Sequence, residues 1–348
     1  MNHDMEKEQI SGEQMSFLDS ENNVIPAKAE TSAADRLKEI PEGAEILMPP
    51  EKPKPKRSKL ENFIQIFLMI VFGSIFAVSA VYLCFNYWNK IQGGQIYGDM
   101  ANDFNVFVPE NENNIELYTA LPLSSSDSPM QNLDNRLTSG NTDATDGNTD
   151  TADRLNAVRE SLKALKDKNP DTYGWIFVEG TDINYPVLRG TDNSYYLTHS
   201  HEKKYLAIGS IFADYQLADN IKDNFNTVFY GHNVVTNVPG SSMFHDVEKF
   251  LKKDFFDEAL IYVYTLDGIF IYKPFSIYPT VSDYQYFKAD FETETSFLTY
   301  ADEYKKNSKV ASNIEVGLGD KILTLSTCTN GPQNARYALH AILVDIIE

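Results

Sequence analysis

The chain has 348 residues, enough for one sizeable domain with appended segments, and 42% of them are hydrophobic. Its formal net charge of −20 argues against nucleic acid as a partner, because an acidic surface repels phosphate backbones. There are two cysteines, and Cys84 lies within an apolar run, so Cys328 has no intrachain disulfide partner outside that run. A single leftover cysteine in an exported protein indicates a reactive thiol or an intermolecular bond.

Residues 1–62 are polar and contain prolines without a sustained apolar period, which predicts a disordered cytoplasmic tail. Residues 63–88 carry no charge and are long enough to cross a bilayer as one helix. The residues just before this run include a basic cluster of Lys52, Lys54, Lys56, Arg57 and Lys59. By the positive-inside rule we expect a single-pass protein of the cell membrane, with a cytoplasmic N-terminus and an extracellular C-terminal part.

A cleaved signal peptide is the alternative interpretation of this run. Residues 77–80 loosely resemble a small-residue cleavage site. However, the segment before the run is far too long for the leading part of a signal peptide, and the apolar residues continue past the site. An uncleaved membrane helix is therefore the better prediction.

Residues 89–152 are predicted to form an extracellular stalk and linker, in which residues 89–120 would be a short stalk or helix. Their second part, from residue 121 onward, is rich in Ser, Thr, Asp, Asn and Gly and cannot bury enough apolar surface to fold alone. Such a segment behaves as a flexible spacer. The globular domain is therefore expected over residues 153–348.

The domain begins with helical spacing over 153–168, where the apolar positions are Leu155, Val158, Leu162 and Leu165. Short strands separated by turn residues follow, over 174–178, 183–188, 209–214, 226–232, 261–266, 268–281, 321–328 and 336–347. Their number and spacing predict a mainly β sandwich or barrel. Helices are expected to interrupt it at about 244–252 and 291–307, the second with core contacts from Phe291, Phe297, Leu298 and Tyr304.

Cys328 ends one of these strands. Alternation puts Ile322, Thr324, Ser326 and Cys328 on one face, and Leu323 and Leu325 on the other. A buried structural cysteine fits this strand as well as a catalytic one, since free cysteines are commonly buried. Chemistry at the thiol would need a nearby histidine or cation, because the thiolate is the nucleophile.

The histidines that follow the apolar run are His199, His201, His232, His245 and His340. His232 ends the strand 226–232, so its ring should project into a loop region at a strand edge. His199 and His201 lie in a polar loop and are expected to be solvated; as a pair they lack a third metal ligand at suitable spacing. His245 opens a helix, and His340 is expected to be packed within a strand. No metal or other cofactor is predicted.

Arg336 could supply the cation. Residues 330–332, Asn-Gly-Pro, are a strong turn signal that folds the next strand back toward Cys328. A guanidinium stays charged and donates in a planar fork, which suits a developing oxyanion. Taken alone, Arg336 is better explained as a solvated charge at a strand end than as a catalytic group. The hypothesis of a catalytic site therefore depends on the combination of Cys328, His232 and Arg336.

The ordered motifs resemble those of class B sortases of Gram-positive bacteria. The matching segments are TLSTC at 324–328, NARY at 334–337 and YGHN at 230–233, with further similar stretches at 174–176, 183–187, 195–197, 209–212, 240–246 and 282–287. The resemblance covers residues 153–348. It implies an eight-stranded sortase-type β-barrel with an N-terminal helix and a class B helix before the cysteine-bearing strand.

The resemblance also implies roles for individual residues. Cys328 would be the nucleophile, His232 the acid/base, and Arg336 the group that stabilises the oxyanion or positions the substrate. Weaker matches near the substrate groove are Leu197, Ser282, Tyr284 and Thr327. Some class B members carry an acidic residue where this chain has Asn330, which puts any role for that acid in doubt here.

A sortase would cleave a C-terminal sorting motif, similar to NPxTN or xPxTG, after its Thr through a thioacyl enzyme. It would then transfer the secreted protein to an amine of a peptidoglycan precursor or of a pilin lysine. Two other functions stay open from the residues alone. One is a cell-wall L,D-transpeptidase-like cysteine enzyme, although such enzymes have a different motif around the thiol. The other is a non-enzymatic surface module with a buried Cys328.

Overall fold

The structure is a computed structural model that describes residues 58–104, 106, 108, 147–281, 288, 289, 291, 293–328 and 335–348, together with two short strands near the N-terminus. Those two strands, β1 (Ser16–Leu18) and β2 (Val24–Pro26), pair with each other in antiparallel register. The other residues of the predicted tail up to residue 57, most of residues 104–146, and the turn at 330–332 lie outside the described residues.

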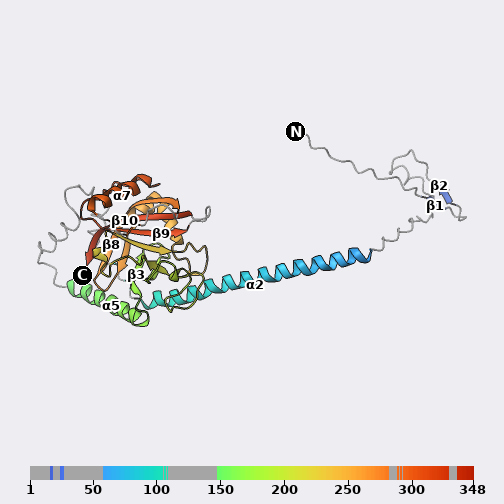
Figure 1. The fold of residues 1–348 in the computed structure, drawn as a ribbon, viewed down its shortest axis with the longest axis horizontal. Coiled ribbons are helices and arrows are strands. Elements are labelled where there is room, and N and C mark those ends of the chain that lie inside the picture. The colour runs from blue at the N-terminus through green and yellow to red at the C-terminus, as the bar shows by residue number, and fades with distance from the viewer. Residues whose placement is uncertain are drawn as a thin grey trace, which may run out of the picture. The chain divides into compact units, whose positions relative to one another are not determined.

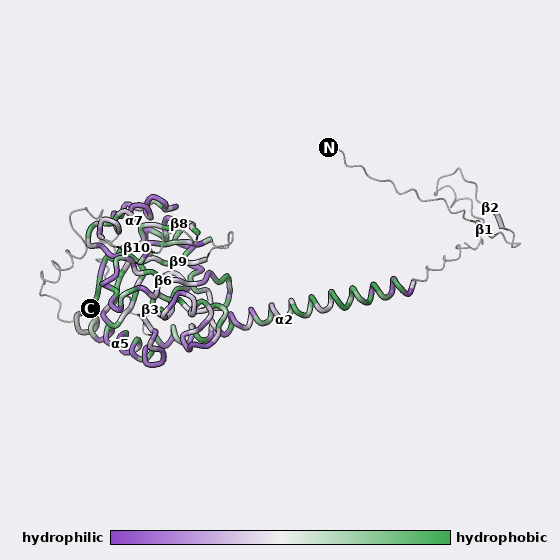
Figure 2. Tube along the Cα trace, in the orientation of Figure 1, coloured by the Kyte–Doolittle hydropathy of each residue, from purple (hydrophilic) through white to green (hydrophobic). Residues whose placement is uncertain are grey.

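Helix α2 (Lys59–Asp103) contains the whole apolar run and continues beyond it. It is, among the described residues, the one helix that is long and apolar enough to cross a membrane. Figure 2 shows its hydrophobic run giving way to a mixed segment toward the C-terminal end. The side chains of Phe63–Trp88 are mostly exposed, whereas Asn89, Gly93, Gly94 and Tyr97 are buried against the folded domain.

The domain is a closed barrel of eight strands in the order β10-β8-β7-β3-β4-β5-β6-β9. Figure 1 labels β3, β8, β9 and β10 of this barrel. The strands are β3 (Thr172–Val178), β4 (Asn184–Leu188), β5 (Ile211–Ala213), β6 (Asn226–Gly231), β7 (Ile261–Tyr264), β8 (Ile269–Val281), β9 (Ile322–Cys328) and β10 (Ala335–Ile347). The pairs β4–β5 and β6–β9 are parallel, and the other neighbours are antiparallel. The predicted eight-stranded barrel is thereby confirmed, with strand ends displaced by at most two residues.

Side-chain alternation divides the barrel into an interior and an outer layer. In β3, Ile176 and Val178 enter the interior core, whereas Trp175 belongs to a second cluster outside it. In β9, Leu323 and Leu325 point inward and Ile322 points outward, as the sequence predicted. The outward-facing Trp175 and Ile322 are as fully buried as the inward-facing residues, because helices cover the outer face.

Two regions of helix cover that outer layer. Helix α5 (Gly147–Lys168) packs Leu155, Val158 and Leu162 against Trp175, together with Phe104 from the segment after α2. The Phe104 and Trp175 rings are stacked with centroids 4.2 Å apart. The N-terminal helix predicted at 153–168 is confirmed and begins earlier than expected.

Helix α7 (Glu294–Asn307) lies between β8 and β9 in sequence and packs on β8, at the position predicted for the class B helix. Its N-terminus is closed by Thr293 and Ser296, which exchange capping hydrogen bonds. Phe291, Phe297 and Tyr304 are buried, as predicted.

The helix expected at 244–252 is instead a 3₁₀ segment, η3 (His245–Leu251), followed by a short α6 (Lys253–Glu258). Two single-turn 3₁₀ elements, η1 (Tyr195–Leu197) and η2 (Ile221–Asp223), complete the described elements.

A polar network under α7 ties β9 to its neighbours. The His340 ring is fully buried, stacked 4.0 Å from the Tyr304 ring, and its Nδ1 lies 2.8 Å from Thr324 Oγ1. Thr324 Oγ1 also donates to Asn226 Oδ1 at 2.8 Å, and His340 Nε2 lies 3.2 Å from Tyr278 Oη. Burial lowers the pKa of His340 from 6.5 to about 3, so the ring is neutral in the folded protein.

This network makes stability depend on pH. Below pH 6.5 the unfolded chain protonates His340 while the folded protein does not, so stability falls as pH decreases from about 6.5 toward 3. We expect His340→Gln, which cannot titrate, to reduce the slope of unfolding free energy between pH 6 and 4 by about 1.4 kcal/mol per pH unit. Denaturant unfolding of wild type and variant at several pH values measures this. Equal slopes would contradict a neutral buried ring.

Candidate active site

Three neighbouring strands meet at one end of the barrel, where β6 and β9 end and β10 begins. Strand β6 runs parallel to β9, with Gly231 opposite Thr327, and β10 runs antiparallel to β9, with Arg336 opposite Cys328. His232 directly follows the last residue of β6, Cys328 is the last residue of β9, and Arg336 is the second residue of β10. The backbone therefore brings all three predicted catalytic positions to one edge.

His232 is held from both sides. Its Nε2 lies 2.8 Å from the carbonyl oxygen of Leu197, and its own carbonyl accepts a hydrogen bond of 2.9 Å from the Phe244 amide. A carbonyl can only accept, so Nε2 carries a proton in this arrangement, and Nδ1 is the nitrogen that could exchange a proton in an acid/base reaction. The half-buried ring is thus oriented by a main-chain group.

The carbonyl of Leu197 belongs to a loop that we call the Leu197 loop, residues 190–210. Near its start, Asp192 Oδ1 accepts the amides of Ser194 and Tyr195 at 2.7 and 2.8 Å. Near its end, the Ser210 amide donates to the Tyr196 carbonyl at 2.9 Å, and the Tyr196 side chain is fully buried. These bonds fix the η1 turn that presents the Leu197 carbonyl to His232.

Arg336 is half-buried and donates one hydrogen bond from its guanidinium to the Ala335 carbonyl at 3.1 Å. A guanidinium has five N–H donors, so this bond does not exhaust them. Arg336 is also paired with Thr280 on the other neighbouring strand, β8. Thr280 lines a hollow of about 510 Å³ with Tyr278, Pro279, Val281, Asn307 and Lys309.

The weaker predicted groove residues are distributed unevenly. The side chain of Leu197 is 39% exposed beside His232, whereas Thr327 is 1% exposed within β9. Ser282 and Tyr284 follow directly after β8 but lie outside the described residues. A second hollow at this end, of about 380 Å³, lies between His232 and Asn233 on one side and Asn86, Asn89 and Lys90 of α2 on the other.

Comparison with known proteins identifies the family. The Sortase domain model matches residues 176–344. The chain is 38% identical over 173 residues to sortase B of Listeria monocytogenes and 36% identical over 173 residues to that of Staphylococcus aureus. Each match covers 49% of this chain and 68% of the relative. The chain belongs to the class B sortases.

Solved structures agree with this assignment. A 2.0 Å crystal structure of Staphylococcus aureus sortase B is 33% identical, with a TM-score of 0.50, covering 55% of this chain and 89% of that one. A mutant form of Clostridium perfringens sortase B is 28% identical, with a TM-score of 0.52, covering 68% of this chain and 100% of that one. Sortases are cysteine transpeptidases, so the assignment displaces both the L,D-transpeptidase and the non-enzymatic alternatives.

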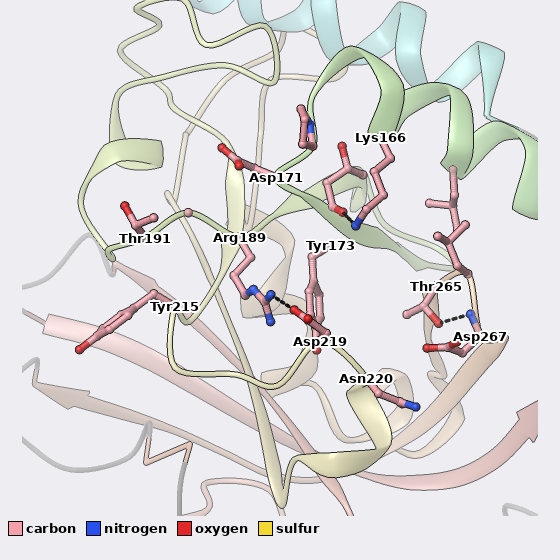
Figure 3. Close-up of a pocket in the computed structure, with 15 residues that line it drawn as sticks. Lys166, Asp171, Tyr173, Arg189, Thr191, Tyr215, Asp219, Asn220, Thr265 and Asp267 are labelled. Carbon is pink, nitrogen blue, oxygen red and sulfur yellow. Dashed lines mark hydrogen bonds and ion pairs between the residues drawn. The ribbon is translucent and has the colours of Figure 1, made fainter.

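The far end of the sortase barrel carries a separate hollow of about 860 Å³ (Figure 3). Its basic side chains are already engaged: Arg189 donates to the Leu217 carbonyl at 2.6 Å and pairs with Asp219, and Lys166 donates to the Thr172 carbonyl. Arg189 also lies over the Tyr173 ring, 5.2 Å from its centroid. None of the predicted catalytic residues lines this hollow.

The expectation that His201 is solvated was wrong. Its ring is 2% exposed, with Nε2 3.1 Å from Thr172 Oγ1, because Asn169 Nδ2 binds the His201 carbonyl at 2.8 Å and closes the loop over the start of β3. Burial lowers its pKa and favours the neutral ring. Within the described residues, no group of three or more metal-ligating side chains occurs.

Sequence reasoning missed the contribution of α2 to this sortase site. Residues after Trp88 were expected to form a short stalk or helix, yet Asn89, Gly93 and Tyr97 contact the Leu197 loop, and Lys90 donates to the Val235 carbonyl on the other side of His232. A signal was present: residues 93, 97, 100 and 104 are small or apolar at helical spacing. The apolar pattern was not recognised because it is short and because polar residues lie between these positions.

Proposed function

We propose that Cys328 is the nucleophile of this sortase, His232 its acid/base, and Arg336 the group that stabilises the oxyanion or positions the substrate. The observation that carries the proposal is the shared register of β6, β9 and β10, in which Arg336 is opposite Cys328 and His232 extends the strand beside it. Residues opposite each other in an antiparallel pair are close neighbours, with Cβ atoms roughly 4.5–5.5 Å apart.

In the first step, the Cys328 thiolate attacks the carbonyl carbon of the Thr residue in a sorting motif. The Arg336 guanidinium compensates the negative charge that develops on the carbonyl oxygen. The C–N bond then breaks, His232 donates a proton to the departing amine, and a thioester to Cys328 remains.

In the second step, an acceptor amine attacks the thioester carbonyl. His232 takes the proton that the amine loses, and Cys328 leaves as a thiolate, which restores the starting state. The hydrogen bond from His232 Nε2 to the Leu197 carbonyl supports this cycle. It keeps Nδ1 as the exchanging nitrogen, and it strengthens when the ring is a cation.

The donor substrates that we propose are secreted proteins with a C-terminal motif similar to NPxTN or xPxTG, and the acceptor is an amine of a peptidoglycan precursor or a pilin lysine. The proposed location is the cell membrane, with α2 as a single-pass anchor, the N-terminus in the cytoplasm and the catalytic domain outside. The apolar run of α2 and the sortase domain that follows it are compatible with a cell-surface enzyme.

Quenched peptides with each motif test the substrate class directly. We expect the full-length enzyme in detergent to cleave NPxTN- or xPxTG-like peptides between Thr and the next residue. It should then join the Thr end to an added α-amine or lysine amine. Mass spectrometry of the products identifies both bonds. Cys328→Ala is the control without a thiol; a Cys328→Ala enzyme that matches wild type on every peptide would sink the proposal.

The roles of His232 and Arg336 predict separate losses. We expect His232→Ala to lower kcat/KM by about 10²–10⁴-fold, the usual value of a positioned acid/base, and Arg336→Ala by about 10²–10³-fold. Arg189→Ala is the matched control, since it removes an arginine at the far end of the barrel (Figure 3). Circular dichroism and thermal melts check the fold. Wild-type turnover in either site variant would remove that residue from the assignment.

The proposed orientation is testable with an epitope tag at the N-terminus. Protease added to intact protoplasts should digest the sortase domain and leave the tag with α2 protected, because basic residues before an apolar helix stay in the cytoplasm. Lysed protoplasts are the control for complete digestion. Loss of the tag while the domain survives would show the opposite orientation.

A further inference from the structure

The segment of α2 beyond the apolar run contacts both loops that flank His232. One is the Leu197 loop, defined above, and the other is the Val235 loop, residues 233–243, which begins directly after His232. Through these two loops, the segment can affect the position of His232.

Two α2 side chains bind the Leu197 loop. Asn89 Oδ1 accepts the Ala207 amide at 3.3 Å. Tyr97 Oη lies 2.7 Å from both the Gly209 carbonyl and Ser210 Oγ, and Ser210 Oγ in turn donates to the His199 carbonyl at 2.7 Å. Tyr97 is 1% exposed, and burial raises the pKa of its hydroxyl, so it remains a donor. One buried hydroxyl therefore holds the C-terminal end of this loop.

Gly209 transmits this contact to the Leu197 carbonyl. Its φ is +58°, and a Cβ there would lie 2.4 Å from the Tyr196 oxygen and 2.5 Å from the Leu197 oxygen. The Gly209 backbone thus lies directly against the carbonyl that accepts His232 Nε2. Displacing Gly209 would displace that acceptor, because no side chain separates the two.

The Val235 loop is bound by the same helix. Lys90 Nζ donates to the Val235 carbonyl at 2.9 Å. Gly94 lies so close to Pro239 that a Cβ at Gly94 would be 2.6 Å from the Pro239 oxygen, and Gly240, with φ +72°, meets the helix backbone in the same way. The Leu197 loop and the Val235 loop therefore both pack against α2.

We propose that Tyr97 is a positioning residue for His232, and that α2 through Tyr97 is a structural part of the active site. Tyr97 holds Gly209 and Ser210, which fix the Leu197 carbonyl, which in turn orients the His232 ring. The inference rests on the proposed acid/base role of His232. In this proposal, the same helix contains the proposed membrane anchor and the residue that orients the His232 ring.

Tyr97→Phe in the full-length enzyme tests this, because it removes the hydroxyl and keeps the ring that packs edge-on against Tyr185. We expect kcat to fall about fivefold, the equivalent of one lost hydrogen bond, with KM for the donor peptide nearly unchanged.

Tyr173→Phe is the matched control. Its hydroxyl donates to the Ala218 carbonyl at 3.1 Å at the far end of the barrel, so we expect a comparable change in Tm with unchanged kcat. Asn89→Ala, which removes the bond to the Ala207 amide, should act in the same direction as Tyr97→Phe and serves if the latter fails to fold. Unchanged kcat in a folded Tyr97→Phe enzyme would overturn the proposal, as would equal losses of kcat in Tyr97→Phe and Tyr173→Phe.

A second readout does not depend on the role of His232. In ¹⁵N-histidine spectra, the Nε2–H of His232 should give a slowly exchanging signal that Tyr97→Phe broadens or shifts and Tyr173→Phe leaves in place. An unchanged signal in Tyr97→Phe would refute the positioning. Wild-type turnover in His232→Ala would instead refute the proposed function, so the two failures are separable.

Discussion

The register of β9 between β6 and β10 is the constraint on which the site depends. Side chains on a strand alternate with a period of two, so a slip of one residue between β9 and β10 would turn Leu323 and Leu325 out of the interior core. It would also move Arg336 to the opposite face from Cys328. The burial of apolar side chains that stabilises the barrel thus also holds the three proposed catalytic positions together.

The Thr324–His340 hydrogen bond strengthens this register from the outer layer. Thr324 and His340 are opposite each other in the β9–β10 pair, and the ring is clamped under Tyr304 of α7. A buried ring with polar partners on both nitrogens fits only one alignment of the strands, because any slip would leave it unsatisfied. The class B helix therefore acts on the strand that carries Cys328, besides covering the core.

Much of this could be predicted because strand patterning is local. The eight strands follow from alternation and turn residues, and the inward side of Leu323 and Leu325 follows from period two. The juxtaposition of His232, Cys328 and Arg336 could not come from the pattern alone, since it depends on which strands are neighbours. The family motifs supplied that information. The burial of His201 and the contacts of Tyr97 were missed because both depend on partners distant in sequence, at Thr172 and at Gly209.

The hydrogen bonds from α2 also limit how far the active site can stand from the apolar run. A helix rises 1.5 Å per residue, so Tyr97 lies roughly 14 Å along the axis from Trp88, and Lys90 only about 3 Å from it. Because Lys90 binds the Val235 loop and Tyr97 the Leu197 loop, both loops stay within that span whatever the tilt of the helix. With α2 as the proposed anchor, the helix residues that bind these two loops would lie within about 14 Å of the end of the apolar run. A sortase held there would meet those substrates whose scissile bond lies close to the membrane surface, and this would restrict its donors by position as well as by motif.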